Sequence, residues 1–342
     1  MSDGGDGALW LSEQEVAALV GLADAVAAVR SALADEAAGR AATMGKTHIT
    51  WDGHTLHALG GRWDARGLVA TKSWAHTAGG AEPMVLVWDQ HEGRLLACIE
   101  AFVLGQLRTA AVSAVATDAL APPEARTMAM IGTGRQALPQ VAAVLAVRDV
   151  TEVRVHSPDA DHRRRFAEEL AGQTAAEVTV WDSVAEAVAG AAVVTTATRA
   201  RLPFLSAAML GPGAHVNAVG AITPERREVA DDVVARCRLV ASDSPEAALR
   251  LSAEVATAPA VTALSEVVAA GDAAAPGATG AGGAAGPGGD LSLFKAMGIG
   301  LADLAVAAEA LTRAEAAGAG RRLPARSRAR PRLLRSHQEA NR

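Results

Sequence analysis

The chain has 342 residues, of which 50 % are hydrophobic, and a formal net charge of −6. That length and composition can fill the cores of two domains. No apolar run approaches the ~20 residues of a membrane-spanning helix, and the start, MSDGGDGALW, lacks the basic and apolar regions of a secretory signal. Cys98 and Cys237 lie in apolar runs without metal-ligand spacing, which is typical of buried thiols in a reducing compartment. We therefore expect a cytoplasmic protein with no membrane segment and no metal site.

Residues 8–118 have the pattern of an α+β domain. Ser12 and Glu15 form a capping box that predicts a helix start, and Leu22–Gly39 predicts a second, alanine-rich helix. Short runs of β-forming residues then predict strands at Lys46–Trp51, Thr55–Leu59, Leu68–Trp74, Met84–Trp88 and Leu95–Ala101.

Three cations stand out in this front region. Lys46 opens a strand, Lys72 lies inside the apolar run LVATKSW, and Arg108 is expected to begin the apolar helix RTAAVSAVATDAL. A charge buried without a partner is costly, so such cations require an anion. A planar guanidinium beside a lysine suits a carboxylate. These residues are therefore candidates for binding a carboxylate substrate.

The segment TMAMIGTGRQA, residues 127–137, predicts a strand, a tight turn and a helix start. Gly132 permits the turn, Gly134 lets the backbone approach a phosphate, and Ala137 takes the third-glycine place of the dinucleotide fingerprint. The unpaired N–H groups and the dipole at a helix start favour a pyrophosphate there. The motif predicts a dinucleotide site.

Strands and helices then alternate to about residue 250, which predicts a parallel sheet covered by helices on both faces. Helices are expected over Asp159–Leu170 and from Ser183. With the strand that begins at Thr127, the sequence predicts six strands of a doubly wound Rossmann domain spanning residues 119–293. The other five are Glu152–His156, Glu177–Trp181, Ala191–Ala197, Ala214–Gly220 and Arg238–Asp243.

Two segments have low-complexity composition. Gly271–Asp290 is rich in glycine and alanine, which predicts a flexible insertion loop. Residues 321–342 contain eight arginines and one glutamate with little apolar content, which predicts a disordered tail. We expect this tail to be solvated rather than bound to nucleic acid.

Several blocks together resemble the ornithine cyclodeaminase/mu-crystallin family over residues 9–318, apart from the insertion. They are LRTAAVSA (107–114), IGTGRQA (131–137), PGAHVNAVG (212–220), SDS (242–244) and FKAMG (294–298) leading to Asp303. The resemblance implies a Rossmann domain joined to a substrate-binding and dimerisation domain, which residues 294–320 rejoin, and a homodimer. It is strongest to the mu-crystallin branch, whose activities include NAD(P)H-dependent reduction of cyclic ketimines.

The resemblance also assigns site residues. Lys72 and Arg108 match the family's carboxylate clamp, and Lys46 stands where an arginine is usual, so the bidentate fork is lost there. The remaining matches surround the cofactor: Gly132, Gly134, Arg135 and Gln136 at the pyrophosphate, and Thr196, Asn217, Val219 and Met297 at the adenosine or nicotinamide. The block around Asp243 is expected to be structural.

One departure from the family pattern concerns the chemistry. Ornithine cyclodeaminases carry an acidic proton shuttle just after the N-A-V-G strand, whereas Ile222 occupies that place here, beside the expected nicotinamide. Isoleucine cannot exchange a proton. The sequence therefore favours a simple reductase over a cyclodeaminase.

The end of the second Rossmann strand bears on the choice of cofactor. NAD enzymes usually place an acid there to bind the ribose 2′-hydroxyl, but the strand ends His156-Ser157-Pro158 and the first acid is Asp159. Ser157 leaves room for a 2′-phosphate that Arg135 can approach, while Pro158 replaces a basic residue common in NADP-using relatives. We favour NADP(H), with NAD(H) as the alternative.

The sequence thus predicts an NAD(P)H-dependent oxidoreductase of amino-acid metabolism that reduces the C=N bond of an α-imino acid or oxidises the matching amino acid. Lys72 or water would supply the proton. Three alternatives stay open: a cyclodeaminase that forms proline or pipecolate, an amino-acid or opine-type dehydrogenase, and a non-enzymatic ligand-binding protein of the mu-crystallin kind.

Overall fold

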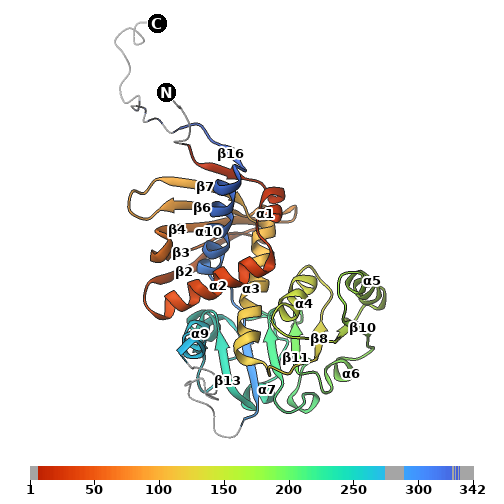
Figure 1. The fold of residues 1–342 in the computed structure, drawn as a ribbon. Helices are drawn as coiled ribbons and strands as arrows, with labels where there is room; N and C mark the ends of the chain where they lie inside the picture. The colour runs from red at the N-terminus through yellow and green to blue at the C-terminus, as the bar shows by residue number, and fades with distance from the viewer. Residues whose placement is uncertain (1–6, 274–288, 326, 328, 330, 332–342) are drawn as a thin grey trace, which may run out of the picture.

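The computed structural model describes residues 7–273 and 289–325 and positions 327, 329 and 331. Two eight-stranded sheets make up the framework. In Figure 1, the first sheet (sheet A) lies in the upper part with α10 beside it, and the second (sheet B) lies in the lower part, with α3 running between them. The chain starts in sheet A, passes through sheet B and returns to sheet A.

Sheet A has the strand order β16-β1-β7-β6-β4-β3-β2, with β5 paired to β4. Its pairs are antiparallel except for β1 and β7, which are parallel. The five strands predicted here are confirmed, and β2 and β3 are longer than predicted. The strands are β1 (Leu9–Leu11), β2 (Ala41–Trp51), β3 (His54–Trp63), β4 (Leu68–Thr77), β5 (Gly80–Ala81), β6 (Met84–Asp89), β7 (Leu95–Glu100) and β16 (Arg321–Arg322).

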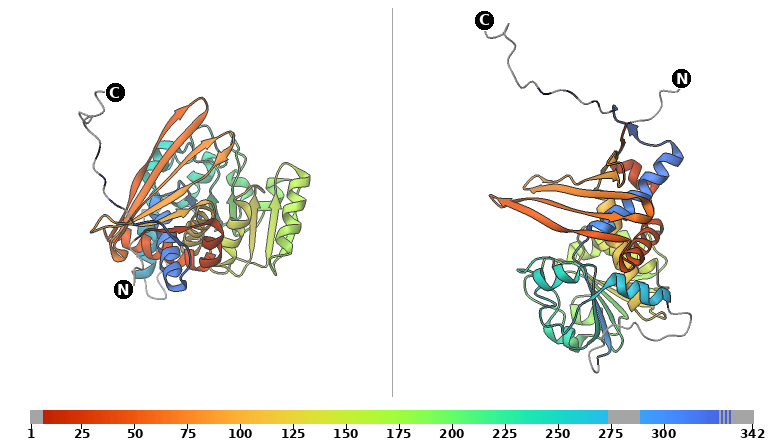
Figure 2. Two further views of the ribbon diagram at one scale, coloured as in Figure 1. Left: turned by 90° about the horizontal axis from the view of Figure 1, so that it is seen from above. Right: turned by 90° about the vertical axis from the view of Figure 1, so that its left-hand side faces the viewer.

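Four helices belong to this part of the molecule: α1 (Glu13–Leu19), α2 (Leu22–Ala37), α3 (Phe102–Leu120) and α10 (Gly300–Ala317). They share one apolar core with the sheet, and α10, whose first twelve residues are aliphatic or glycine apart from Asp303 and Glu309, is buried along most of its length. The β2–β3 hairpin extends beyond the rest of the sheet (Figure 2).

Helix α1 begins with the predicted capping box, since Ser12 accepts from the Glu15 amide and the Glu15 carboxylate accepts from the Ser12 amide. The expectation that Arg108 begins a helix is wrong, because α3 starts at Phe102. The Glu13 carboxylate accepts hydrogen bonds from the Phe102 and Val103 amides at 2.6 and 2.7 Å. A cap supplied by a distant residue thus extends the helix, and Arg108 lies in its second turn.

Sheet B is parallel throughout, with the order β10-β9-β8-β11-β12-β15-β13-β14. The doubly wound fold and all six predicted strands are confirmed. The strands are β8 (Thr127–Ile131), β9 (Glu152–His156), β10 (Glu177–Val180), β11 (Val193–Thr196), β12 (His215–Ala218), β13 (Cys237–Ser242), β14 (Thr262–Ala263) and β15 (Leu291–Lys295).

The helices of this second part are α4 (Ala137–Leu145), α5 (Ala160–Ala171), α6 (Val184–Val188), α7 (Asp231–Ala235), α8 (Pro245–Leu251) and α9 (Leu264–Ala273), and 3₁₀ turns occur at Asp64–Arg66 and Ala207–Met209. Both predicted helix starts are correct: the side chains of Asp159 and Ser183 cap α5 and α6. Cys98 and Cys237 are buried and form no disulfide.

The position of β15 was not predicted. This fully buried strand lies between β12 and β13, so the sixth predicted strand does not pair directly with the fifth. The segment that follows the insertion therefore completes sheet B and leads straight into α10, which packs on sheet A. The short segment between β15 and α10 therefore connects sheet B directly to sheet A.

The low-complexity predictions fall mostly on 274–288 and 332–342, which lie outside the described residues. Within the predicted tail, Arg321 and Arg322 pair with Trp10 and Leu9 as β16. Among the described residues, no single helix is long and apolar enough to cross a membrane. Helices α1 and α2 have that length and apolarity only when taken together, and they are bent by 85° at the break between them.

Candidate functional site

Two of the predicted cations meet one buried carboxylate. The Lys72 amine on β4 donates to Asp303 Oδ1 over 2.9 Å, and the Arg108 Nε on α3 lies 3.3 Å from the same oxygen. Asp303 lies in the first turn of α10 and its side chain is only 2 % exposed. The anion that we expected beside these buried cations is thus in part the Asp303 carboxylate of the protein itself. We call Lys72, Arg108 and Asp303 the cation clamp.

Lys46 on β2 belongs to the same electrostatic group. Burial lowers the pKa of the Lys46 amine below its ordinary value, and the charges of Arg108 and Lys72 lower it further, while Asp303 opposes them. Burial likewise lowers the pKa of Lys72, against the effect of Asp303. Three cations therefore lie around the Asp303 carboxylate, and the buried Asp243 carboxylate also acts on Arg108. This surplus of positive charge in a partly desolvated place suits an incoming anion.

The chain segment after β15 lies against the clamp. Asp243, at the end of β13, accepts hydrogen bonds from the Met297 and Gly298 amides, both at 2.8 Å. Gly298 has a φ of +85°, and a Cβ there would lie 3.0 Å from Arg108 Nη1. The turn thus needs glycine both for its backbone and for the space beside Arg108. Asp243 holds this turn, as its predicted structural role requires.

A narrow pocket brings three of the predicted residues together. It lies between the start of β2 and helix α8, and Lys46, Ile222 and Met297 all line it. Ser244 and Gly298, from two of the family blocks, also line it. The remaining lining residues, which the sequence analysis did not single out, are Thr43, Met44, Gly45, Glu246, Ala247, Arg250 and Leu251. We call this the β2–α8 pocket.

The glycine turn has the geometry that a dinucleotide phosphate requires. Gly132 has a φ of +106°, and a Cβ there would lie 2.6 Å from the Ala197 carbonyl oxygen. No heavy atom lies within 4 Å of the place that a Cβ on Gly134 would take. Gln136 stands at the N-cap of α4. In the first turn of α4 the Ala137 amide donates to the Gly134 carbonyl oxygen over 2.8 Å, and Pro139 has no N–H, so the open approach to the backbone is at Gly134. The turn therefore presents open backbone, and its residues fit the group that the fingerprint implies.

Arg135 and Ser157 lie in different surroundings from those expected. The Arg135 guanidinium lies over the Phe102 ring at 5.0 Å. Ser157 is 6 % exposed, its hydroxyl receives a hydrogen bond from Thr133 at 3.1 Å, and its carbonyl receives one from Arg163 at 3.0 Å. The cation next to the end of β9 is thus Arg163, which also pairs with Asp182. The sequence analysis did not single it out.

Thr196 and Val219 lie next to a buried acid network. Thr196 Oγ1 donates to Glu228 Oε2 over 2.9 Å, and the Gly220 amide donates to the same oxygen over 2.8 Å. Burial raises the pKa of the Glu228 carboxyl, and the nearby Glu254 charge adds to the rise. Val219 is 8 % exposed and packs in the core that α3 and α10 share.

Asn217 is fully buried beneath α3. Its amide donates to Thr117 Oγ1 over 2.9 Å, and His215 Nε2 lies 3.1 Å from its side-chain oxygen. Burial lowers the pKa of His215 to about 4, so the imidazole is neutral. The structure therefore places Asn217 at the contact between sheet B and α3, apart from the residues that line the β2–α8 pocket.

Asp303 is the site residue to which the sequence analysis assigned no role, although it named Asp303 at the end of the last family block. The reasoning that singled out Lys72, a charge within an apolar run, applies equally to the acid in GIGLADLAVAA at the start of α10. The hydrogen bond that joins Lys72 to Asp303 spans 231 positions, however. A charge pattern flags both residues separately, and only the fold pairs them.

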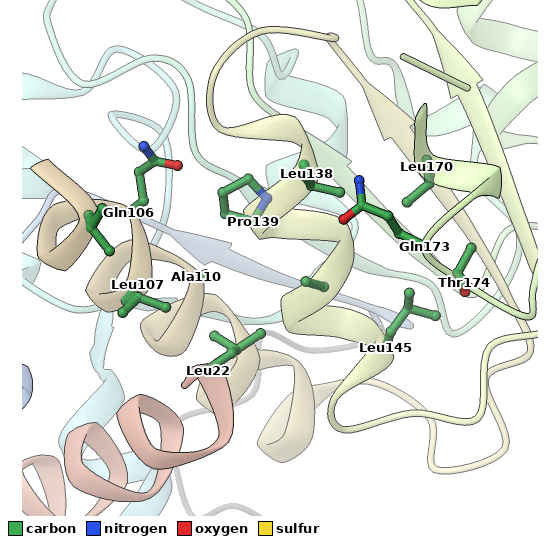
Figure 3. A pocket seen from close by; sticks show the side chains of 12 residues that line it. Leu22, Gln106, Leu107, Ala110, Leu138, Pro139, Leu145, Leu170, Gln173 and Thr174 are labelled. Atoms are coloured by element: carbon green, nitrogen blue, oxygen red, sulfur yellow. The ribbon is translucent and has the colours of Figure 1, made fainter. Parts of the chain in front are cut away.

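A larger hollow lies elsewhere. It encloses about 320 Å³ between α3 and α4, and Figure 3 shows leucines from both helices converging on it. The lining is mostly aliphatic and contains no charged side chain and none of the predicted site residues. Charged side chains are gathered instead at the clamp and at the β2–α8 pocket.

Comparison with known proteins gives a consistent assignment. Residues 9–317 match the model of the ornithine cyclodeaminase/mu-crystallin family. A Δ1-pyrroline-2-carboxylate reductase of Bacillus cereus is 30 % identical over 240 residues, which cover 70 % of this chain and 73 % of that protein. A ketimine reductase mu-crystallin of Macropus fuliginosus is 38 % identical over 179 residues, covering 52 % of this chain and 55 % of the relative. The match thus spans about half the length of that mu-crystallin.

A solved structure supports the same fold over nearly the whole chain. The probable ornithine cyclodeaminase of Bordetella pertussis superposes with a TM-score of 0.80 at 27 % sequence identity. The superposition covers 91 % of this chain and 98 % of that protein.

Proposed function

Because the chain belongs to the ornithine cyclodeaminase/mu-crystallin family, we propose that it is a nicotinamide-dependent oxidoreductase that reduces the C=N bond of an α-imino acid or oxidises the matching amino acid. The observation that carries the proposal is the cation clamp with Lys46, where three cations lie around the shared carboxylate of Asp303. The names of the relatives, pyrroline-carboxylate and ketimine reductases, agree with this chemistry.

In this proposal Lys72 and Arg108 bind the substrate carboxylate and so fix the adjacent imine carbon. Asp303 holds both cations in place, which limits the reorganisation needed when the substrate arrives. Lys46 adds positive charge at the mouth of the same group. The amine of Lys72 or a water molecule gives the proton that the imine nitrogen gains.

Gly132, Gly134, Arg135 and Gln136 would hold the pyrophosphate of the cofactor at the start of α4, with Ile222 and Met297 around the rest. The open backbone at Gly134 supports this placement. Thr196, Asn217 and Val219 are buried and would act by supporting the ends of β11 and β12 rather than by lining the cofactor. A reduced nicotinamide, when bound, supplies the hydride for the imine carbon.

We further propose that residues 8–118 with 294–320 form the substrate domain and residues 119–293 the cofactor domain.

For the form of the cofactor we propose NADP(H) over NAD(H). The end of β9 carries no acid that would repel a 2′-phosphate before Asp159, and Arg163 donates to the Ser157 carbonyl there. Asp159 is occupied in capping α5. A cation at this place favours the phosphorylated ribose.

A cyclodeaminase is less well supported, because Ile222 lines the β2–α8 pocket where a proton shuttle would have to stand. The experiment that decides is direct. The purified protein is mixed with NADPH or NADH and a cyclic imino acid, and the nicotinamide absorbance is followed. Loss of absorbance with formation of the amino acid is the expected result. A second assay supplies ornithine in place of the imino acid. If the protein converts ornithine to proline and ammonia and reduces no imine, the cyclodeaminase replaces the proposal.

We also propose that the chain forms a homodimer through sheet A. Ile49 and Leu56 are cross-strand partners on the β2–β3 hairpin, and 64 % and 43 % of their surfaces are exposed. Burial of such a pair by a second copy would be favourable. Light scattering should give about twice the chain mass of 34.7 kDa, and Ile49→Asp should lower it. A wild-type mass equal to one chain would contradict the proposal.

A further inference from the structure

Three flat side chains stand in one row across sheet A. His48 on β2 is the cross-strand partner of His57 on β3, and His57 is the partner of Trp74 on β4. The two imidazole centres are 5.5 Å apart, and His57 is stacked on the Trp74 indole at 4.8 Å with an angle of 24°. The three rings therefore form one continuous surface, which we call the ring row.

The ring row adjoins the carboxylate-binding cations. Side chains alternate between the faces of a strand, so Lys72 and Trp74, two positions apart on β4, share a face. The amines of Lys46 and Lys72 both lie 5.6 Å from the centre of the Trp74 ring. Whatever carboxylate these cations bind has the indole as its neighbour.

This face is also the one on which α10 packs, and the helix leaves the ring row uncovered. A Cβ on Gly61, which shares the face of His57, would lie 3.0 Å from Leu301 at the start of α10. Further along the helix, Glu309 pairs with Arg66, which lies beyond the far end of β3. Helix α10 thus runs from Gly61 away from the tip of the β2–β3 hairpin. The ring row lies between the start of α10 and that tip, next to the clamp.

His57, at the centre of the row, provides a flat surface without a charge at neutral pH. Burial, together with the nearby Lys46, His48 and His76, lowers the pKa of His57 to about 4. A neutral imidazole stacked on an indole offers an extended π face, against which aromatic groups pack in offset or edge-on geometry.

We propose that the ring row makes this protein selective for α-imino acids in which the C=N carbon is joined to a flat, aromatic group. The proposal rests on the proposed reduction at the same site. The carboxylate would be held by Lys72 and Arg108, and the aromatic group would lie against Trp74 and His57. In the reaction, a hydride from the reduced nicotinamide bonds to the imine carbon, a proton bonds to the nitrogen, and the C=N double bond becomes single.

The same surroundings disfavour a substrate with a cationic side chain. Leu59, the cross-strand partner of Lys72, is a buried aliphatic residue rather than an acid. The carboxylate of Asp303 is already shared by Lys72 and Arg108. A terminal ammonium, as in ornithine or lysine, would therefore lie next to the positive charges of Lys46, Lys72 and Arg108, which repel it.

The test compares two cyclic imino acids that differ in flatness. One is 3,4-dihydroisoquinoline-1-carboxylate, whose imine carbon is attached to a fused benzene ring, and the other is the aliphatic 1-piperideine-2-carboxylate. We expect kcat/KM of the wild type to favour the aromatic compound by about tenfold or more, from stacking plus apolar contact. Trp74→Ala should remove that preference, mainly through KM for the aromatic compound, and Trp74→Phe should keep most of it.

Trp51→Ala is the matched control. Trp51 lies on the same hairpin, but by alternation on the opposite face, and it is 41 % exposed. This variant should keep the wild-type preference. Absence of a preference in the wild type would overturn the inference. An equal loss of kcat/KM for both compounds in Trp74→Ala would also overturn it, because the indole would then only support the lysines. A halving of the molecular mass in Trp74→Ala would overturn it as well, because the ring row would then be a subunit contact.

If the wild type reduces neither compound, the proposed reduction fails, and calorimetry then decides the inference separately. The amino acids titrated with oxidised cofactor present are tetrahydroisoquinoline-1-carboxylate and pipecolate. Tighter binding of the aromatic amino acid by the wild type, lost in Trp74→Ala and kept in Trp51→Ala, would uphold the selectivity of the ring row. Equal affinity, or no binding of either, would overturn it.

Discussion

The cation clamp and the glycine turn are built in opposite ways. The glycine turn is contiguous in sequence, and its function depends on backbone that a side chain would obstruct, as the place of a Cβ on Gly132 illustrates. The clamp is assembled from β4, α3 and α10, and its function depends on charged side chains that share one carboxylate. Damage to the turn should therefore act on the cofactor, and damage to the clamp on the substrate.

We expect Arg108→Ala to give the largest difference between an effect on substrate turnover and an effect on cofactor binding. Removing one partner of a buried charge group costs about 2–5 kcal/mol, which is roughly 30- to 4,000-fold in kcat/KM. The affinity for the cofactor should be unchanged, because Arg108 lies outside the glycine turn. Steady-state kinetics and a cofactor titration measure the two effects. Arg94→Ala, at an exposed arginine paired with Glu92, is the control; near wild-type activity in Arg108→Ala would show that the carboxylate binds elsewhere.

The converse experiment compares two glycines of the turn. Gly132→Ala forces a Cβ against the Ala197 carbonyl at a positive φ, which should cost about 1–3 kcal/mol of stability and weaken cofactor binding. Gly134→Ala has open space around the new Cβ, so it should weaken cofactor binding and leave the Tm of the cofactor-free protein unchanged. Thermal unfolding without cofactor, with binding measured separately, distinguishes them. A Tm loss of the same size in both variants would contradict this account of the turn.

Lys46 offers a pH test of the clamp alone. Because burial and the neighbouring cations lower its pKa, Lys46 loses its charge at a lower pH than an exposed lysine, and substrate binding should weaken as the pH rises through that value. Lys46→Arg, which stays charged, should move the alkaline fall of kcat/KM to higher pH. The folded state binds fewer protons here than the unfolded state, so stability rises with pH between the folded pKa and the ordinary 10.5.

Two further measurements check this reading. Lys46→Met should raise stability below the lowered pKa, since it removes the cost of burying the charge, while it lowers kcat/KM. The pH dependence of cofactor binding should not change in either variant. An alkaline limb that is the same in Lys46→Arg and in the wild type would remove Lys46 from the substrate site.

The smallest effect is expected at the far end of the cofactor site. If Arg163 recognises a 2′-phosphate, Arg163→Ala should weaken NADPH binding by about 1 kcal/mol, roughly fivefold, and leave NADH binding nearly unchanged. Arg164→Ala, at the neighbouring exposed arginine paired with Asp161, is the control. Tighter binding of NADH than of NADPH by the wild type would overturn the proposed cofactor preference.

The difference between the regions also explains what could be predicted. The strands of both sheets, the caps at Ser12 and Asp159 and the turn at Gly132 depend on residues close together in the chain, so their patterns are readable locally. The start of α3 was misplaced because its cap, Glu13, comes from 89 positions away. The insertion of β15 between β12 and β13 has no local signal either, since its apolar run fits any central strand.

The sequence by itself determined the fold class, the dinucleotide turn and the unusual cations, because periodicity, turn chemistry and charge in apolar runs are local properties. The missing proton shuttle at Ile222 was found only through the resemblance to the family. Only the tertiary structure decided that Asp303 is shared by Lys72 and Arg108, that Asn217 is buried under Thr117, and that a ring row adjoins the clamp. These pairings depend on strand register and on the return of α10 to sheet A. Both are set by burial summed over the whole core, which no short segment encodes.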